Sequence, residues 1–192
     1  MIAILKYNAG NTTSVKNAVE RLGYSCVVTD DPQVLQKAAK VIFPGVGEAS
    51  TAMRYLKKRE LDILIQSLKQ PVLGICLGLQ LLCKHSEEND TSCIGVFDAE
   101  VKRFPNELIV PHMGWNVLEV KESKLLKGIS VVDDVYFVHS YYAEVSKDTK
   151  AICNYGIDFS AAMQKDNFYA TQFHPEKSAG IGEQILKNFL EI

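Results

Sequence analysis

The stretch that decides the fold is Pro71-Val-Leu-Gly-Ile-Cys-Leu-Gly-Leu-Gln-Leu-Leu-Cys83, an apolar run in which Cys76 lies two residues from a glycine on either side. We interpret it as a strand, a sharp turn and a helix, because Gly-x-Cys-x-Gly is the thiol form of the nucleophile elbow. Gly74 and Gly78 let the neighbouring backbones approach closely. A helix start at Cys76 favours thiolate over thiol, and the N–H of Leu77 is placed to donate an oxyanion hydrogen bond. The alternative is a small apolar cysteine packed in a strand.

A second motif, Gln172-Phe-His-Pro-Glu176, follows a strand-like segment at 168–171. His174 and Glu176 are two residues apart, so on extended backbone both side chains leave by the same face. A carboxylate beside an imidazole fixes its tautomer and stabilises its charged form. Alone, this motif is also compatible with a surface turn. Together with the elbow, it predicts Cys76 as nucleophile, His174 as base and Glu176 as the residue that orients the base.

Length and composition limit the classes of protein to which the chain can belong. The chain has 192 residues, enough for one sizeable core, so we expect a single domain over 1–192. A net charge of −2 gives no electrostatic case for binding nucleic acid or an anionic membrane. Five cysteines without Cys-x-x-Cys argue against a disulfide framework and a zinc ribbon and suit a reducing cytoplasm. The four histidines and five cysteines lack ligand spacing. We therefore expect a cytoplasmic protein without a metal, a cofactor or a membrane segment.

Strands alternate with helical patterns in the first half of the chain. Strands are expected at 2–7, 25–29 and 41–43, with helices at 15–22 and 34–39 between them. The fold class is therefore α/β, with a mostly parallel central sheet covered by helices on both faces. After residue 92 the chain changes to short strands and hairpins, which predicts an antiparallel extension of that sheet, and 179–192 closes the chain as a helix.

Pro44-Gly-Val-Gly47 ends the third expected strand. Loops at the carboxyl ends of parallel strands are where ligands bind, and two glycines let the backbone turn its N–H groups inward. We predict that Val46 and Gly47 supply the second oxyanion donor. The alternative is that Pro-Gly-x-Gly is only a tight turn.

The elbow (74–82) and the 172–176 motif resemble those of class I glutamine amidotransferases, whose glutaminase domains have a flavodoxin-like fold. The resemblance covers essentially the whole chain. It implies hydrolysis of L-glutamine to glutamate and ammonia through a cysteine thioester. It also implies an oxyanion role for Pro-Gly-Val-Gly. The implied glutamine-binding residues are Gln80, Glu88 at the acidic end of the elbow helix, Ser140 and Tyr141.

Within this class the chain is most similar to the glutaminase subunits of imidazole glycerol phosphate synthases, which act in histidine biosynthesis. The resemblance implies a heterodimer with a TIM-barrel cyclase that consumes the ammonia. Asn11, Met113 and Trp115 are expected to face that partner, the latter two from a loop at 111–116. The usual first turn, Asp-Tyr-Gly-x-Gly-Asn, is replaced here by Lys6-Tyr-Asn-Ala-Gly-Asn11.

Several alternatives remain at the level of sequence. The acceptor could instead be a nucleotide-sugar amidotransferase or a pyridoxal phosphate synthase. The chain could be a free-standing cysteine hydrolase, or a scaffold with an inactive site, although all three catalytic residue types are present. His139 could act as the base, but no carboxylate lies two residues after it, which favours a structural, hydrogen-bonded role.

Overall fold

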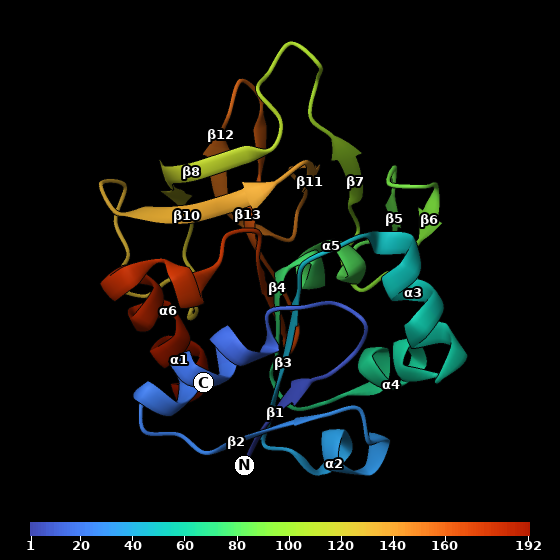
Figure 1. The fold of residues 1–192 in the computed structure, drawn as a ribbon. Helices are drawn as coiled ribbons and strands as arrows, with labels where there is room; N and C mark the ends of the chain where they lie inside the picture. Colours follow the sequence, from blue (N-terminus) through green and yellow to red (C-terminus); the bar gives the residue numbers. More distant parts are fainter.

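The computed structural model describes residues 1–192 as a layered α/β structure (Figure 1). The helices are α1 (Thr12–Arg21), α2 (Pro32–Lys37), α3 (Ala49–Lys58), α4 (Leu61–Ser67), α5 (Leu77–Leu82) and α6 (Ala179–Glu191), with a 3-10 turn η1 (Pro175–Lys177). The first strands are β1 (Ile2–Leu5), β2 (Cys26–Thr29), β3 (Lys40–Gly45), β4 (Val72–Cys76), β5 (His85–Ser86), β6 (Thr91–Ser92) and β7 (Glu100–Arg103). The remaining strands are β8 (His112–Val117), β9 (Glu119–Val120), β10 (Asp134–His139), β11 (Tyr141–Ala143), β12 (Thr149–Asn154), β13 (Asp158–Lys165) and β14 (Phe168–Thr171).

The main sheet has eight strands in the order β2-β1-β3-β4-β14-β13-β12-β9. The five strands from β2 to β14 run parallel, and β13, β12 and β9 continue the sheet antiparallel. The expected hairpin forms between β13 and β14, where Lys165 pairs with Phe168. This arrangement confirms the predicted parallel sheet with an antiparallel extension.

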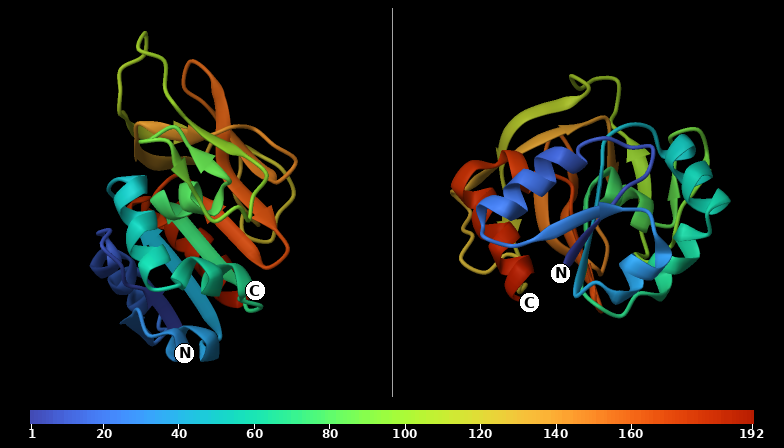
Figure 2. Two further views of the ribbon diagram at one scale, coloured as in Figure 1. Left: turned by 90° about the vertical axis from the view of Figure 1, so that its right-hand side faces the viewer. Right: turned by 60° about the horizontal axis from the view of Figure 1, so that its bottom comes forward.

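Helices cover both faces of this sheet, because successive strand side chains point to opposite sides. In β1, Ala3 and Leu5 belong to a core that also contains residues of α3 and α4. Ile2 and Ile4 belong to a second core with residues of α1 and α6. Figure 2 shows the two groups of helices on opposite sides of the sheet. No helix is both long and apolar enough to cross a bilayer.

Two smaller sheets differ from the expected single extension. β10 pairs with β8, and β11, β7, β5 and β6 form a second small sheet. The segment 111–116, expected as a loop, is therefore largely strand β8, whose residues Trp115 and Met113 pair with Tyr136 and Val138 of β10. These partners lie 21 and 25 residues further along the chain, so the local sequence of the segment does not reveal the pairing.

The elbow helix is shorter than expected. α5 ends at Leu82, and Cys83 takes up extended backbone that leads into β5, which pairs with β7. The prediction that this helix continues to an acidic end at 87–90 is wrong. Glu88 instead lies in the turn between β5 and β6.

Candidate active site

Cys76 lies at the last position of β4 and directly before α5, in a backbone conformation that side chains rarely adopt. Its φ is 54° and its ψ is −106°. The turn brings neighbouring backbones so close together that only glycine fits at two positions beside it. A Cβ on Gly78 would lie 1.9 Å from the carbonyl oxygen of Phe43, and one on Gly74 would lie 3.0 Å from the Gly78 backbone. These contacts confirm the predicted strand–elbow–helix geometry.

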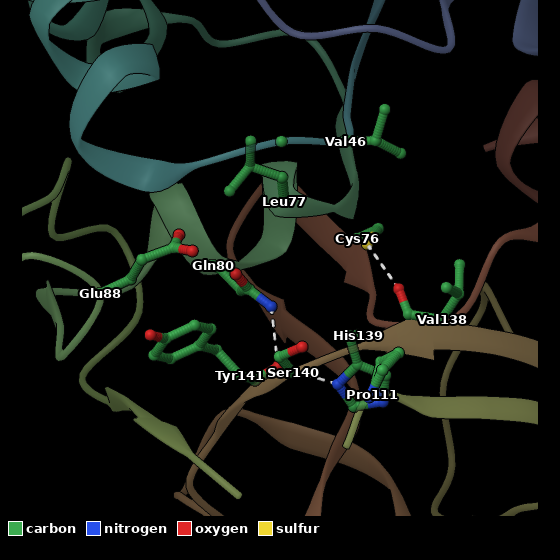
Figure 3. Close-up of a pocket in the computed structure, with 11 residues that line it drawn as sticks. Val46, Cys76, Leu77, Gln80, Glu88, Pro111, Val138, His139, Ser140 and Tyr141 are labelled. Carbon is green, nitrogen blue, oxygen red and sulfur yellow. Dashed lines mark hydrogen bonds between the residues drawn. The ribbon is translucent and has the colours of Figure 1, made fainter.

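A pocket of about 260 Å³ opens beside this cysteine (Figure 3). It brings together every residue that the sequence assigned to the oxyanion site and to glutamine: Val46, Gly47, Leu77, Gln80, Glu88, Ser140 and Tyr141. These residues come from the end of β3, from α5, from the β5–β6 turn and from the junction of β10 and β11. The pocket therefore lies at the carboxyl ends of the parallel strands β3 and β4, where α/β folds bind ligands.

Two polar side chains in this pocket are held by hydrogen bonds. Gln80 donates its amide N–H groups to the carbonyl of Tyr141 at 2.8 Å and to Oε1 of Gln172 at 3.1 Å. Glu88 accepts a hydrogen bond of 2.7 Å from the N–H of Ala49. Burial raises the pKa of Glu88, and the Ala49 hydrogen bond opposes this rise. The Gln80 nitrogen is thus already paired, which leaves its oxygen for a ligand.

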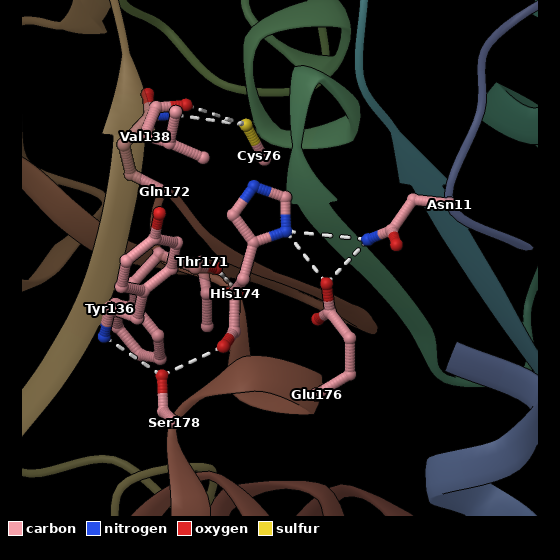
Figure 4. A network of polar contacts seen from close by, with 10 residues as sticks. Asn11, Cys76, Tyr136, Val138, Thr171, Gln172, His174, Glu176 and Ser178 are labelled. Atoms are coloured by element: carbon pink, nitrogen blue, oxygen red, sulfur yellow. Dashed lines mark hydrogen bonds and ion pairs between the residues drawn. The ribbon is translucent and has the colours of Figure 1, made fainter. Parts of the chain in front are cut away.

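His174 and Glu176 lie behind the pocket wall and are completely buried (Figure 4). Nδ1 of His174 donates to Oε1 of Glu176 at 2.7 Å. The main chain of His174 is also fixed, since its N–H donates to the carbonyl of Tyr136 and its carbonyl accepts from the hydroxyl of Ser178. Nε2 is buried without a hydrogen-bond partner and faces the Cys76 sulfur. The imidazole therefore stands between the thiol and the carboxylate.

The charges around this imidazole decide its protonation. Burial alone lowers the pKa of His174, but the negative charges of Cys76 and Glu176 outweigh burial and raise the pKa to about 10. The contacts of His174 thus favour its imidazolium form, and a cation beside a cysteine favours the thiolate, which is the nucleophilic form. α5 has only six residues, so its dipole is short, and an imidazolium beside the thiol is a second source of thiolate stabilisation.

Gln172 is a site residue to which the sequence reasoning gave no role. It is completely buried, and its Nε2 lies 3.7 Å from the Cys76 sulfur as a donor, while its Oε1 accepts from Gln80. It thus links the nucleophile to the residue one helical turn further on. The signal was present in the sequence, because an amide at the end of an apolar strand requires buried partners.

His139 lines the pocket, but both of its ring nitrogens contact groups other than Cys76. Its Nδ1 donates to the carbonyl of Tyr141 at 2.8 Å, and its Nε2 lies 3.1 Å from Nδ1 of His112. Burial lowers the pKa of His139 to about 3 and that of His112 to about 4, so both rings are neutral. These bonds confirm His139 as a hydrogen-bonded histidine of the framework.

The three residues expected at a partner interface differ in where their side chains point. Met113 and Trp115 are 67% and 50% exposed on β8, which leaves two large apolar side chains in solvent beside the pocket. Asn11 instead turns its side chain inward and donates to Oε1 of Glu176.

Comparisons with known proteins agree with this geometry. The family model described as glutamine amidotransferase class-I matches residues 3–192. The chain is 57% identical over 194 residues to the imidazole glycerol phosphate synthase subunit HisH of Bacteroides fragilis, with 100% of this chain and 99% of that protein covered. It is 45% identical to the HisH subunit of Vibrio cholerae over 199 residues, covering 100% of this chain and 98% of that protein.

Among solved structures, the crystal structure of a glutamine amidotransferase superposes with a TM-score of 0.77 at 20% identity, over 99% of this chain and 97% of that one. PurLQS from Thermotoga maritima gives a TM-score of 0.74 at 14% identity, over 99% and 97%. These two structures support the fold. The family model and the full-length relatives go further, and they show that this chain belongs to the class I glutamine amidotransferase family.

Proposed function

We propose that the chain is a single-domain glutaminase that hydrolyses L-glutamine and delivers the ammonia to a synthase subunit. The observation that carries this proposal is a pocket lined by the elbow cysteine and several polar groups, with a buried His–Glu pair whose imidazole faces the cysteine sulfur. Neither a dead scaffold nor a metal enzyme requires that combination.

In the proposed reaction, the Cys76 thiolate attacks the side-chain amide carbon of glutamine. The N–H groups of Leu77 and of the Val46–Gly47 loop stabilise the oxyanion of the tetrahedral intermediate. His174, oriented by Glu176, protonates the amide nitrogen as its bond to the carbonyl carbon breaks. Ammonia departs, and a glutamyl thioester remains on the sulfur. The same imidazole then takes a proton from water, which hydrolyses the thioester to glutamate.

The α-amino and α-carboxyl groups of glutamine are bound at the other end of the pocket. The Glu88 carboxylate pairs with the α-ammonium, and Gln80 contacts the substrate through its free oxygen. Backbone N–H groups at Ser140 and Tyr141 bind the α-carboxylate. These contacts to the two opposite charges on the α-carbon fix the orientation of the amino acid and bring the side-chain amide, at its other end, to Cys76.

The ammonia requires a docked partner. In bulk water near neutral pH it would become ammonium, which has no lone pair for attack. The partner that we propose is a TIM-barrel cyclase that makes imidazole glycerol phosphate and an aminoimidazole carboxamide ribotide in histidine biosynthesis. Support comes from the full-length relatives, which are named as HisH subunits of that synthase. Five unpaired cysteines fit a reducing compartment such as the cytoplasm.

A reconstitution experiment tests this function. The chain is mixed with the candidate cyclase and its nucleotide substrate, and product is measured with glutamine or with ammonium salt as nitrogen donor. We expect glutamine-dependent product from the wild-type complex, and product only from ammonium when Cys76→Ala replaces the wild type. Product from glutamine with the Cys76→Ala chain, or none with the wild type while ammonium supports turnover, would reject the proposal.

A further inference from the structure

Asn11 occupies the N-cap position of α1 but does not cap the helix. Its backbone is left-handed, with φ 78° and ψ 4°, and its side chain makes no capping hydrogen bond. Asparagine at this position ordinarily accepts a hydrogen bond from the second or third N–H of the helix. Here the side chain is directed across to η1 instead (Figure 4). Helix stability therefore does not account for its conformation.

The group that Asn11 contacts is the buried carboxylate of Glu176. Oε1 of that carboxylate accepts two hydrogen bonds, one from Nδ1 of His174 and one from Nδ2 of Asn11. Oε2 is buried without a partner. The 3.4 Å contact between Nδ2 of Asn11 and Nδ1 of His174 joins two donors and adds no bond. Asn11 is therefore the one neutral donor that holds this carboxylate, and a buried carboxylate depends strongly on its donors.

The residue before Asn11 contacts the other side of the site. The N–H of Gly10 donates to the carbonyl of Val46 at 3.3 Å, in the predicted oxyanion loop. Two consecutive residues thus contact the loop after β3 and the turn after β14, which are about 130 residues apart in the sequence. This places Asn11 where it can fix the carboxylate relative to the rest of the site.

We propose that Asn11 is a positioning residue for the triad: its side-chain amide holds the Glu176 carboxylate in the orientation that directs the imidazole of His174 at the Cys76 sulfur. The inference rests on the proposed glutaminase function and deepens it. It also gives Asn11 a role inside the active site, which the expected position at the partner surface does not include.

The first test is Asn11→Ala, assayed as the full complex with the cyclase at saturating concentration. Losing a hydrogen bond to a charged group lowers kcat by roughly 10- to 100-fold. KM for glutamine stays close to that of wild type, because Asn11 does not line the pocket. Saturation with the cyclase separates this effect from any change in partner affinity.

The second test is Asn11→Asp, which keeps the shape and replaces the donor by an acceptor. The titratable groups that act on His174 are Cys76 on β4 and Glu176 on η1, together with His139 on β10. The introduced carboxyl group lies against Oε1 of Glu176, and two carboxylates this close share one proton. It donates in place of the amide only while it stays protonated, so the alkaline limb of the kcat/KM profile moves to lower pH. Partial unfolding would lower the amplitude of the profile without moving this limb.

Asn8→Ala is the matched control. Asn8 lies in the same loop, but it is exposed and donates to the carbonyl of Thr51. We expect its kcat to stay within about twofold of wild type, the scale of a lost exposed hydrogen bond. Wild-type kcat in Asn11→Ala, or an unmoved alkaline limb in Asn11→Asp, overturns the positioning role. No turnover by the wild-type complex would instead contradict the glutaminase function, and the pH profile of Cys76 alkylation then still tests Asn11.

Discussion

Nδ1 of His174 donates to Oε1 of Glu176 over 2.7 Å, and neither side chain is exposed to solvent. Removing two ionisable groups from water is costly unless further partners compensate. Those partners are the Cys76 sulfur, which Nε2 of the imidazole faces, and Asn11, which donates to the same carboxylate oxygen as His174. A framework with no chemical role would gain more from apolar side chains at these positions, so the buried pair is the most direct structural sign of catalysis.

The charge of Glu176 is tested by Glu176→Gln, which keeps the shape of the side chain. We expect kcat to fall roughly 100-fold, the scale of a lost general-base partner. Because the carboxylate helps to raise the pKa of His174 to about 10, its loss moves the alkaline limb of the kcat/KM profile to lower pH. Glu183→Gln, at an exposed ion pair with Arg21 on α1, is the matched control and leaves the profile unchanged. An alkaline limb at the wild-type pH in Glu176→Gln would show that the carboxylate charge does not act on His174.

The elbow geometry is tested by Gly78→Ala. A methyl group at this position would lie 1.9 Å from the Phe43 carbonyl oxygen, so β3 and α5 must move apart. We expect the free energy of unfolding to fall by about 3 kcal/mol or more, measured by chemical denaturation. Gly180→Ala is the control, because its methyl group meets nothing within 4 Å and it should stay within about 1 kcal/mol of wild type. Equal stabilities of the two variants would contradict the close packing of the elbow.

The buried imidazole of His139 predicts a pH dependence of stability. Its pKa falls from about 6.5 in the unfolded chain to about 3 when folded, so the unfolded state binds more protons between these values. Stability from this group is therefore complete above pH 6.5 and is lost as the pH falls towards 3, by at most about 1.4 kcal/mol per pH unit.

The variant His139→Asn keeps a donor in the place of Nδ1 and removes the titration. Unfolding free energies measured at several pH values between 6.5 and 4 should decline less steeply for this variant than for wild type. Parallel slopes would mean that His139 is already protonated in the folded protein.

Trp115 should anchor the partner. Large aromatic side chains at the centre of an interface often contribute 2 kcal/mol or more, so Trp115→Ala should weaken cyclase binding roughly 30-fold. Val132→Ala is the control, since Val132 is 81% exposed on a separate loop and should leave the affinity unchanged. Titration of the cyclase with each variant gives the dissociation constants. Equal losses, or none in Trp115→Ala, would place the interface elsewhere.

The sequence predicted the elbow and the parallel sheet because each depends on a local pattern, whereas the glutamine-binding residues were implied by the family resemblance. Gly74 and Gly78 mark a tight turn whichever elements surround it, and alternating strands and helices imply a parallel sheet. The end of α5 was not predictable in this way. It is set by pairing of β5 with β7, which is a contact between distant segments that no helical periodicity records.

Asn11 and Gln172 illustrate the same limit at the site. Both carry amides whose partners lie more than 90 residues away in the chain. The family resemblance implies a partner-facing position for Asn11, and only the folded chain brings its amide to Glu176. For Trp115 on β8, the exposed position was expected from the sequence. Its strand conformation was not, because that depends on pairing with β10.

The central claim is that the Cys76 sulfur forms the bond to glutamine. The most direct test is to mix the complex with radiolabelled glutamine, quench it in acid within the turnover time and map the labelled peptide. We predict label on the peptide that contains Cys76, no label in Cys76→Ala, and full label in Cys93→Ser, whose thiol lies outside the pocket. Ammonia release should fall by more than about 10⁴-fold in Cys76→Ala. Ammonia release at the wild-type rate by that variant, or label on any other residue, would contradict the account.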